Sequence, residues 1–194
     1  MNYLAHAYLS FHQPDLLAGN LISDFVKGKK KFDYSPGVQR GIVLHREIDA
    51  FTDSHPATLE ARQVFRPHYR LYAGAFVDVV YDHFLAIDTT AFGTQGLLAF
   101  SQETYDMMQP YLITAPAGFN RMFAHMQQHN WLYNYQFMEG IEKSMGGLAY
   151  RAKYLTEGAT AFHIFKEYYQ HLGDCYAVFF PELKNFVIRR MAAI

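Results

Sequence analysis

The chain has 194 residues, a formal net charge of −1 at pH 7 and a hydrophobic fraction of 51%. This length and composition are those of a folded domain with a substantial core, and they exclude a disordered chain. The small net charge argues against general nucleic-acid binding, and the single cysteine, Cys175, excludes an intrachain disulfide and a thiolate zinc cluster.

The N-terminus and the apolar runs give expectations about location. The opening MNYLAHAYLS has neither the basic region nor the long apolar run of a secretory signal. No stretch of the sequence approaches the ~20 uninterrupted apolar residues that cross a bilayer. We therefore expect a cytoplasmic protein with neither a membrane nor a nucleic acid as partner.

Apolar residues recur with helical spacing, and alternation bounded by hairpin turns is absent, so the sequence predicts an all-α fold in one domain, residues 1–194. Ser35 followed by Pro36 predicts an N-cap and a helix start. Thr94 is a further candidate cap, and the two glycines at 146–147 predict a helix end. In chain order we expect helices at 3–11, 14–27, from 36, from 56, at 70–87, 94–108, from 116, at 130–147, and one or two from 156 with Pro181 as the interruption.

The segment GIVLHREIDAFTD, residues 41–53, sets titratable side chains beside an apolar stripe. His45, Asp49 and Asp53 are four residues apart. At about 100° per residue they adjoin the buried side of the helix, whereas a solvated charged face more often points away from the core. The pattern is typical of metal ligands, and equally of an i,i+4 pair on a helix surface.

A later helix places two carboxylates in apolar surroundings. Asp78 and Asp82 share one face, while their neighbours from Phe76 to Leu85 are apolar in nearly every direction. Two buried carboxylates repel each other and need cations, which a divalent metal or arginine and lysine partners can supply.

The first two helices carry similar polar stripes, with His6 on one and with Asn20, Asp24 and Lys27 on the other. A lone histidine on an apolar face is most often a hydrogen-bonded structural residue, and both interpretations of His6 stay open. Imidazoles and carboxylates converging from packed helices build metal sites in bundles, and such ligands suit Mn²⁺, Mg²⁺ or Fe²⁺. Trp131 is expected in the core, and His125 and His129 are expected to have no role.

Five segments in order resemble the acyl carrier protein phosphodiesterase family of bacteria: MNYLAH, GNLISDFVKG, GIVLHREIDAFTDSHP, DVVYDHFL and NWLYNY. The resemblance is weaker after these segments. It implies an HD-like helical bundle, distantly related to the HD-type metal-dependent phosphohydrolases. It also implies hydrolysis of the phosphodiester that joins 4′-phosphopantetheine to a serine of holo-acyl carrier protein, with a divalent cation, typically Mn²⁺.

The sequence departs from HD-type proteins because it contains no His-Asp dipeptide, only the spaced pair His45/Asp49 and the reversed pair Asp82-His83. The ligands are therefore assigned from the polar stripes. For the phosphate, we expect contacts from Lys27, Arg46 and Asn20. The candidate catalytic and metal-binding residues are Asp24, His45, Asp49, Asp78 and Asp82, with His6 and His83 as additional ligands.

The implied partner is a small acidic protein, holo-acyl carrier protein. Lys27, Lys29, Lys30 and Lys31 form a candidate docking patch, since complementary charge speeds encounter; Arg62, Arg66 and Arg70 are candidates to extend it. Two alternatives stay open: a metal-dependent phosphohydrolase acting on a nucleotide or another small phosphoester, and a non-catalytic helical binding protein whose aspartates pair with arginine or lysine.

Overall fold

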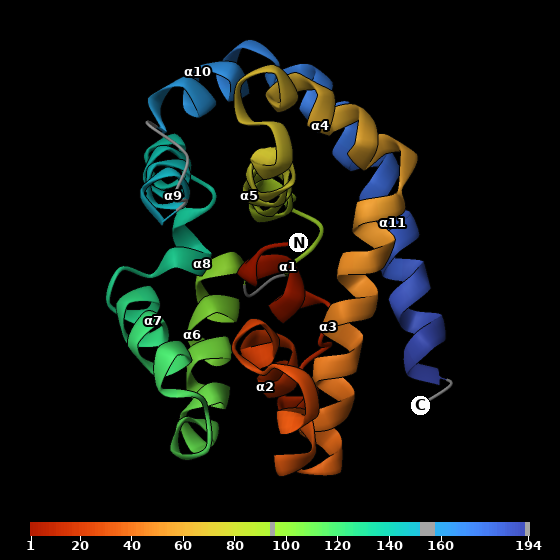
Figure 1. Ribbon diagram of the computed structural model, residues 1–194, viewed down its shortest axis with the longest axis vertical. Helices are drawn as coiled ribbons and strands as arrows, with labels where there is room; N and C mark the ends of the chain where they lie inside the picture. The colour runs from red at the N-terminus through yellow and green to blue at the C-terminus, as the bar shows by residue number, and fades with distance from the viewer. Residues whose placement is uncertain (94–95, 152–157, 193–194) are drawn as a thin grey trace.

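The computed structural model describes residues 1–93, 96–151 and 158–192. These residues form α-helices and short 3₁₀ segments and contain no β-strand, which confirms the predicted all-α class (Figure 1). None of their helices is long and apolar enough to cross a membrane. The helices are α1 Tyr3–Tyr8, α2 Pro14–Ile22, α3 Pro36–Ser54, α4 Pro56–Tyr69, α5 Ala73–Ile87, α6 Gly96–Met108, α7 Ala117–Gln128, α8 Trp131–Asn134, α9 Met138–Arg151, α10 Ala159–Glu167 and α11 Tyr169–Ala192.

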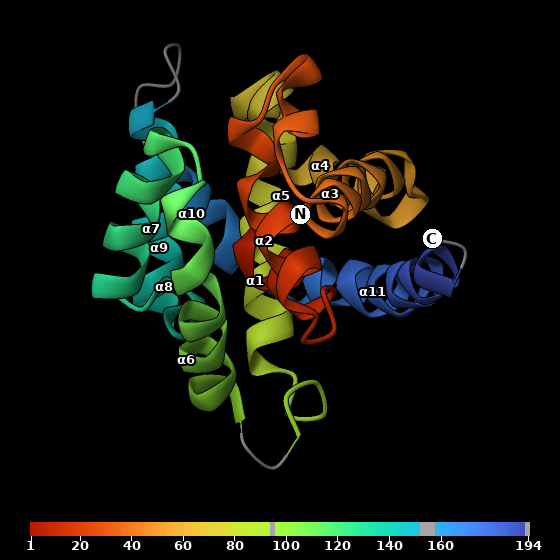
Figure 2. The ribbon, with the colours of Figure 1, turned by 90° about the horizontal axis from the view of Figure 1, so that it is seen from below.

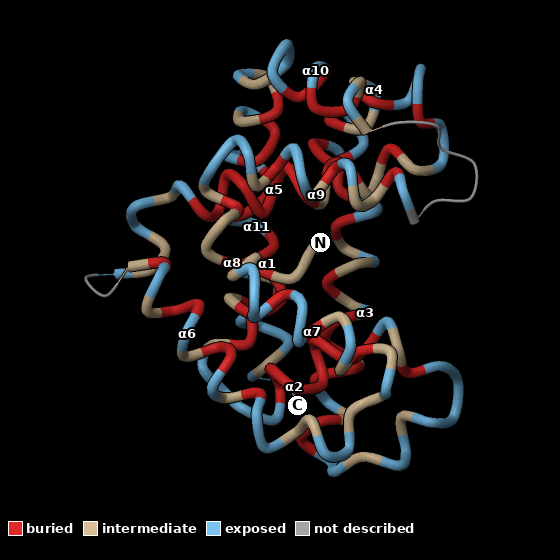
Figure 3. Tube along the Cα trace, turned by 90° about the vertical axis from the view of Figure 1, so that its left-hand side faces the viewer, coloured by how far each residue is buried: buried red, intermediate tan, exposed pale blue. Residues whose placement is uncertain are grey.

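Helix α5 forms the middle of the fold. In Figure 2, α1, α2 and α5 lie between α6–α10 on one side and α3, α4 and α11 on the other. Phe76, Val80, Tyr81 and Leu85 of α5 are fully buried, which fits the sequence expectation that this helix is apolar in nearly every direction. In Figure 3, α1, α2, α3 and α5 each contain stretches of buried residues.

Helices α2 and α3 touch through their backbones. A Cβ atom on Gly19 would lie 2.1 Å from the carbonyl oxygen of Val38, and one on Gly41 would lie 2.4 Å from that of Leu16. Only glycine fits at either position without moving a helix. This close approach brings Asn20 of α2 next to His45 of α3.

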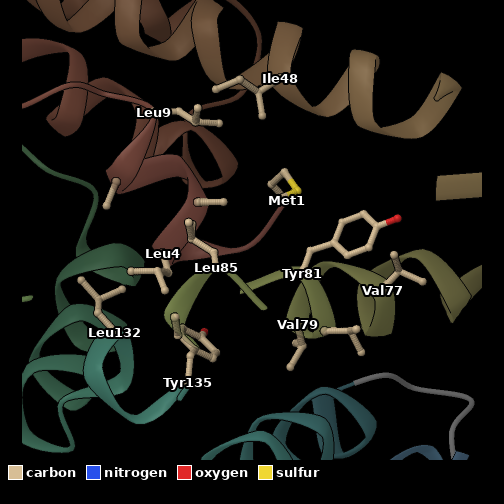
Figure 4. Packing of buried hydrophobic residues seen from close by; sticks show 14 of the residues in the cluster. Met1, Leu4, Leu9, Ile48, Val77, Val79, Tyr81, Leu85, Leu132 and Tyr135 are labelled. Carbon is tan, nitrogen blue, oxygen red and sulfur yellow. The ribbon is translucent and has the colours of Figure 1, made fainter. Parts of the chain in front are cut away.

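Helix α1 is anchored by α5. Both oxygens of Asp82 accept backbone hydrogen bonds at the start of α1, from the N–H of Leu4 at 2.8 Å and from the N–H of Ala5 at 3.0 Å. A helix of six residues is not stable by itself, so these bonds and its apolar packing fix its position. Figure 4 shows Met1 between Ile48 of α3 and Tyr81 of α5.

Several expected helix boundaries are confirmed. Ser35 Oγ accepts a hydrogen bond from the Val38 N–H at 3.4 Å, and Pro36 is the first residue of α3. The break before Pro56 is also present. The first helix is shorter than expected because Phe11 and His12 have positive φ angles of 47° and 55°.

Other expected boundaries are wrong. The glycines at 146–147 lie inside α9, which continues to Arg151. Pro181 lies inside α11, where flanking side chains such as Phe179, Phe180 and Leu183 are buried in the core and hold the helix together across the missing N–H. The second helix ends at Ile22 and a 3₁₀ turn follows. Thr94 and Thr156 lie outside the described residues.

Candidate active site

Two histidines and an aspartate meet where α1, α2 and α3 come together. Asp49 lies between them, with Oδ1 3.2 Å from His6 Nε2 and Oδ2 3.1 Å from His45 Nε2. The imidazole rings are stacked, with centroids 4.0 Å apart. Asp24, at the exposed edge, places Oδ1 3.3 Å from His45 Nε2. We call His6, Asp24, His45 and Asp49 the His–Asp cluster.

Asn20 fixes the orientation of both rings from behind. Its Nδ2 donates to the His6 carbonyl oxygen at 2.9 Å and to Ser10 Oγ at 3.1 Å, so its Oδ1 is the acceptor for His6 Nδ1–H at 2.7 Å. His45 Nδ1–H donates to the backbone oxygen of Asn20 at 2.7 Å. When neutral, both imidazoles therefore keep the lone pair on Nε2 directed at Asp49, as a metal-binding histidine does.

The two histidines differ in charge. Burial, together with the nearby His45, lowers the pKa of His6 to about 4. Burial would also lower the pKa of His45, but the hydrogen bonds that it donates to Asp24 and Asp49 overcome this effect and raise this pKa to about 9. Burial would raise the pKa of Asp49, yet the hydrogen bond that it accepts from His45 and the adjacent Met1 α-amino group hold this pKa well below its usual range. Without a metal, the cluster therefore holds a proton on His45 and a carboxylate on Asp49.

A positive charge lies between Asp49 and the next aspartate of the site. The Met1 α-amino group is 3.1 Å from Asp49 Oδ1 and 3.3 Å from Asp78 Oδ1. Asp78 is a candidate that the structure brings to the cluster, and burial raises its pKa. Asp49 and Asp78 thus share a cation, the N-terminal amine, whereas the sequence predicted a shared cation for Asp78 and Asp82.

Asp82 and His83 are not brought to the cluster. Both Asp82 oxygens are occupied by the start of α1. His83 donates from Nδ1 to the Tyr135 carbonyl oxygen at 2.8 Å and accepts at Nε2 from the Tyr169 hydroxyl at 2.9 Å. Their interpretation changes accordingly: Asp82 positions α1, which carries His6, and His83 joins α5 to the segments after α8 and α10.

The expected phosphate-binding residues lie in different places. Asn20 is fully buried and uses its amide within the protein, so its role here is to position the histidines. Arg46 is exposed and donates to the Val26 carbonyl oxygen at 3.1 Å, which ties α3 to the segment after Asp24. Lys27 is exposed in that same segment. Asp53 pairs with Arg62 and does not join the cluster.

A cavity of about 910 Å³ opens beside the cluster. His6, Asp24 and His45 line one side, and residues of α8 and α9 line the side facing them. Trp131, His125 and His129 also line this cavity, a position that neither composition nor helical spacing indicated. A second cavity of about 800 Å³ shares Asp78 with the first and is lined by Arg62, Arg66 and Arg70.

The residues of the cluster fit a divalent cation. His6, His45 and Asp49 each offer a ligand atom, and these atoms lie within 4.8 Å of one another. His6 Nε2 is buried and lies close to Asp49, but it makes no hydrogen bond with any described residue. A buried imidazole nitrogen whose lone pair is fixed and meets no donor is suited to bind a metal ion. Imidazole and carboxylate donors suit Mn²⁺ or Fe²⁺.

Another group of potential ligands lies between α4 and α11. Glu60, His171 and Cys175 bring their ligand atoms within 4.8 Å. Burial and the nearby Glu60 raise the pKa of Cys175 to about 11. The thiol therefore stays protonated at neutral pH, and the group is a poorer metal site than the His–Asp cluster, since metals bind the thiolate.

An all-α protein in which imidazoles and carboxylates meet at a cavity of this size has the architecture of a helical enzyme. The profile of the family described as acyl carrier protein phosphodiesterase matches residues 1–183. The chain therefore belongs to the acyl carrier protein phosphodiesterase family, a family of hydrolases, and the resemblance found in the sequence is confirmed over nearly the whole chain.

Individual relatives agree with this assignment. A protein of Yersinia pestis named acyl carrier protein phosphodiesterase is 34% identical over 184 residues, 94% of this chain and 95% of its own length. A protein of Photorhabdus laumondii with the same name is 32% identical and covers 93% of this chain and 92% of its own length. No solved structure matched the chain, and the relation to HD-type phosphohydrolases stays a prediction.

Proposed function

We propose that this chain removes 4′-phosphopantetheine from holo-acyl carrier protein by hydrolysis of the phosphodiester. The observation that carries the proposal is the convergence of His6, His45 and Asp49 at the edge of a large cavity. Membership of the family supports the same substrate. The non-catalytic alternative expects lysine or arginine side chains beside the aspartates; among the described residues, Asp24 and Asp49 instead lie beside histidines and the Met1 α-amino group, which disfavours it.

His6, His45 and Asp49 would hold the cation, with Asp78 as a further carboxylate beside it. When bound, a divalent cation supplies positive charge to the phosphodiester and acidifies water near neutral pH. Mn²⁺ is the ion we expect, with Mg²⁺ and Fe²⁺ as alternatives. Asn20 keeps both Nε2 lone pairs on the cation side of the rings.

Asp24 is the candidate general base. It is the most exposed carboxylate of the cluster, and its hydrogen bond with His45 lowers its pKa, so that it is ionised at neutral pH. In the reaction, a water oxygen forms a bond to phosphorus while the bond from phosphorus to the serine oxygen breaks. The water proton passes to Asp24, and a proton from solvent water neutralises the leaving serine oxygen. The products are apo-protein and free 4′-phosphopantetheine.

The carrier protein would dock on the basic segment that follows Asp24. Lys27, Lys29 and Lys30 are exposed, and Arg46 holds the start of this segment against α3. Arg66 and Arg70, on the rim of the second cavity, offer a separate basic surface on the other side of Asp78. A cytoplasmic location is part of this proposal.

Mass spectrometry of holo-acyl carrier protein tests the function directly. Incubation with the protein and Mn²⁺ should remove the phosphopantetheine mass, and His45→Ala should prevent this removal. Ser10→Ala, which changes a hydroxyl behind the cluster, should retain activity. An intact holo-protein after incubation with Mn²⁺, Mg²⁺ or Fe²⁺, combined with hydrolysis of a nucleotide phosphoester, would support the small-substrate alternative instead.

A further inference from the structure

We propose that the cavity between the His–Asp cluster and α9 binds the pantetheine arm of the substrate, and that Gly147 keeps this cavity open. The proposal rests on the proposed function, because it identifies where the leaving cofactor lies. The cavity of about 910 Å³ continues from His6 and His45 to Gly147 and Leu148 on α9. It falls within the range of pockets that enclose small molecules.

The chemistry of the walls fits a pantetheine chain. Pantetheine alternates short apolar segments, including a dimethyl-substituted carbon, with two amide groups. Ala75, Val79 and Leu148 supply apolar surface, and Asn2 and Asn134 supply carboxamides that suit amide partners.

The walls are ordered by the protein itself. Asn2 Nδ2 donates to the Tyr135 hydroxyl at 2.9 Å, and Asn134 Nδ2 donates to the His129 carbonyl oxygen at 2.7 Å. These bonds hold each carboxamide in one orientation before any ligand enters, which lowers the entropy cost of binding. Part of the cavity wall is therefore preorganised for a ligand.

Gly147 gives a way to fill the cavity without disturbing the fold. A Cβ atom on Gly147 meets no described atom within 4 Å, and Gly147 lines the cavity. Its neighbour Gly146 also has free space around a Cβ atom, but it is exposed and is not among the cavity residues. Gly147→Phe should therefore occupy the cavity, and Gly146→Phe is the matched control on the same helix.

Trp131 provides a readout that does not depend on turnover. It is the single tryptophan of the chain and it lines the cavity. Titration of the full chain with pantetheine should change its fluorescence saturably in the wild type and in Gly146→Phe. In Gly147→Phe the affinity should fall by about tenfold or more. Equal affinity in Gly147→Phe and the wild type would overturn the proposal.

Activity measurements separate this proposal from the proposed function. Gly147→Phe should slow release of 4′-phosphopantetheine from holo-acyl carrier protein and leave hydrolysis of bis(4-nitrophenyl) phosphate at the wild-type rate. If wild-type protein releases 4′-phosphopantetheine but pantetheine leaves Trp131 fluorescence unchanged, only the cavity assignment fails. If the wild type releases none, the proposed function fails. Circular dichroism checks folding, and Gly147→Leu replaces Gly147→Phe if the larger side chain unfolds the protein.

Discussion

Asn20 orients both histidines of the cluster, through its side-chain oxygen for His6 and its backbone oxygen for His45. A side-chain substitution removes only the bond to His6, because the backbone oxygen remains. The sequence placed Asn20 on the same stripe as Asp24 and therefore near the site. It gave no indication that the amide would face the histidines, since helical spacing defines a face and not the atoms opposite it.

For Asn20→Ala we expect Mn²⁺ affinity to fall by about 10- to 100-fold, the usual effect of losing such a partner. The reason is that the His6 ring loses the acceptor that fixes its tautomer. Isothermal titration with Mn²⁺ measures the change. Ser10→Ala is the control because it removes a bond to Asn20 Nδ2 and leaves Oδ1 in place. Unchanged affinity in Asn20→Ala would show that Asn20 does not support the metal site.

Asp82 shows the same limit of sequence reasoning. Its burial and its position four residues after Asp78 were visible in the pattern. Its actual neighbours, the N–H groups of Leu4 and Ala5, depend on how α1 packs against α5. By contrast, the candidates His6, Asp24, His45 and Asp49 do lie together. The reason is that α1, α2 and α3 follow one another in the chain and pack against one another.

Asp82 should make stability depend on pH. Burial raises its pKa to about 7 from 3.8, although the bonds from Leu4 and Ala5 oppose the rise. The folded protein therefore holds a proton that the unfolded chain has released, and this group lowers the free energy of unfolding as pH rises from about 4 to about 7. The difference in unfolding free energy, wild type minus Asp82→Asn, should decrease over that interval and stay constant above it. Urea unfolding at several pH values measures it; a difference that grows with pH would mean that Asp82 is ionised in the fold.

At the scale of elements, periodicity predicted where helices exist better than where they end. The α3 start was predicted by Ser35 and Pro36, a local signal. The sequence did not predict that α9 continues through two glycines or that α11 continues through Pro181. In both helices the flanking buried side chains, such as Met145 and Phe180, pack into the core and outweigh the local preference.

The contact between α2 and α3 predicts a sensitive glycine. Gly19→Ala would push a methyl group against the Val38 carbonyl oxygen and separate Asn20 from His45. We expect a loss of about 1–3 kcal/mol in unfolding free energy, as for an overpacked core, together with reduced activity. Gly146→Ala is the matched control, since its methyl group would meet no described atom within 4 Å and should stabilise α9 by about 0.5–1 kcal/mol. Thermal unfolding of both variants gives the comparison, and equal effects would contradict the close-contact argument.

The 3₁₀ segment Gly28–Asp33 carries the proposed docking charges. Lys30→Glu should raise KM for holo-acyl carrier protein and leave hydrolysis of bis(4-nitrophenyl) phosphate unchanged, because docking acts on encounter and not on bond cleavage. Arg66→Glu makes the same charge change on the other basic surface. Steady-state kinetics of Lys30→Glu and Arg66→Glu with both substrates show which basic surface docks the carrier protein. An effect of Lys30→Glu on both substrates would place Lys30 near the reacting phosphate, and an effect of Arg66→Glu alone would move the docking surface to the second cavity.

For the whole molecule, the metal should act as a cross-link. The cluster joins α1 to α3, with Asp24 adding the segment after α2, so a bound cation stabilises the folded state only. At Mn²⁺ concentrations about 100 times Kd, the added stability is about 2.7 kcal/mol, or a Tm increase of about 5–10 °C for a chain of this size. Thermal unfolding with Mn²⁺ and with a chelator measures it. His45→Ala should show no such increase, and an equal increase in that variant would place the metal elsewhere.

The His–Asp cluster is complete by residue 49, whereas the cavity wall that faces it begins at His125. In the proposed assignment, the reactive groups come from the first 49 residues and Asp78, whereas α8 and α9 supply the facing wall together with Asn2, Ala75 and Val79. Mutations in α8 or α9 can change the substrate specificity while the reactive groups keep their arrangement. During evolution, substitutions in the wall formed by α8 and α9 can therefore alter specificity without any change in the residues that cleave the phosphodiester.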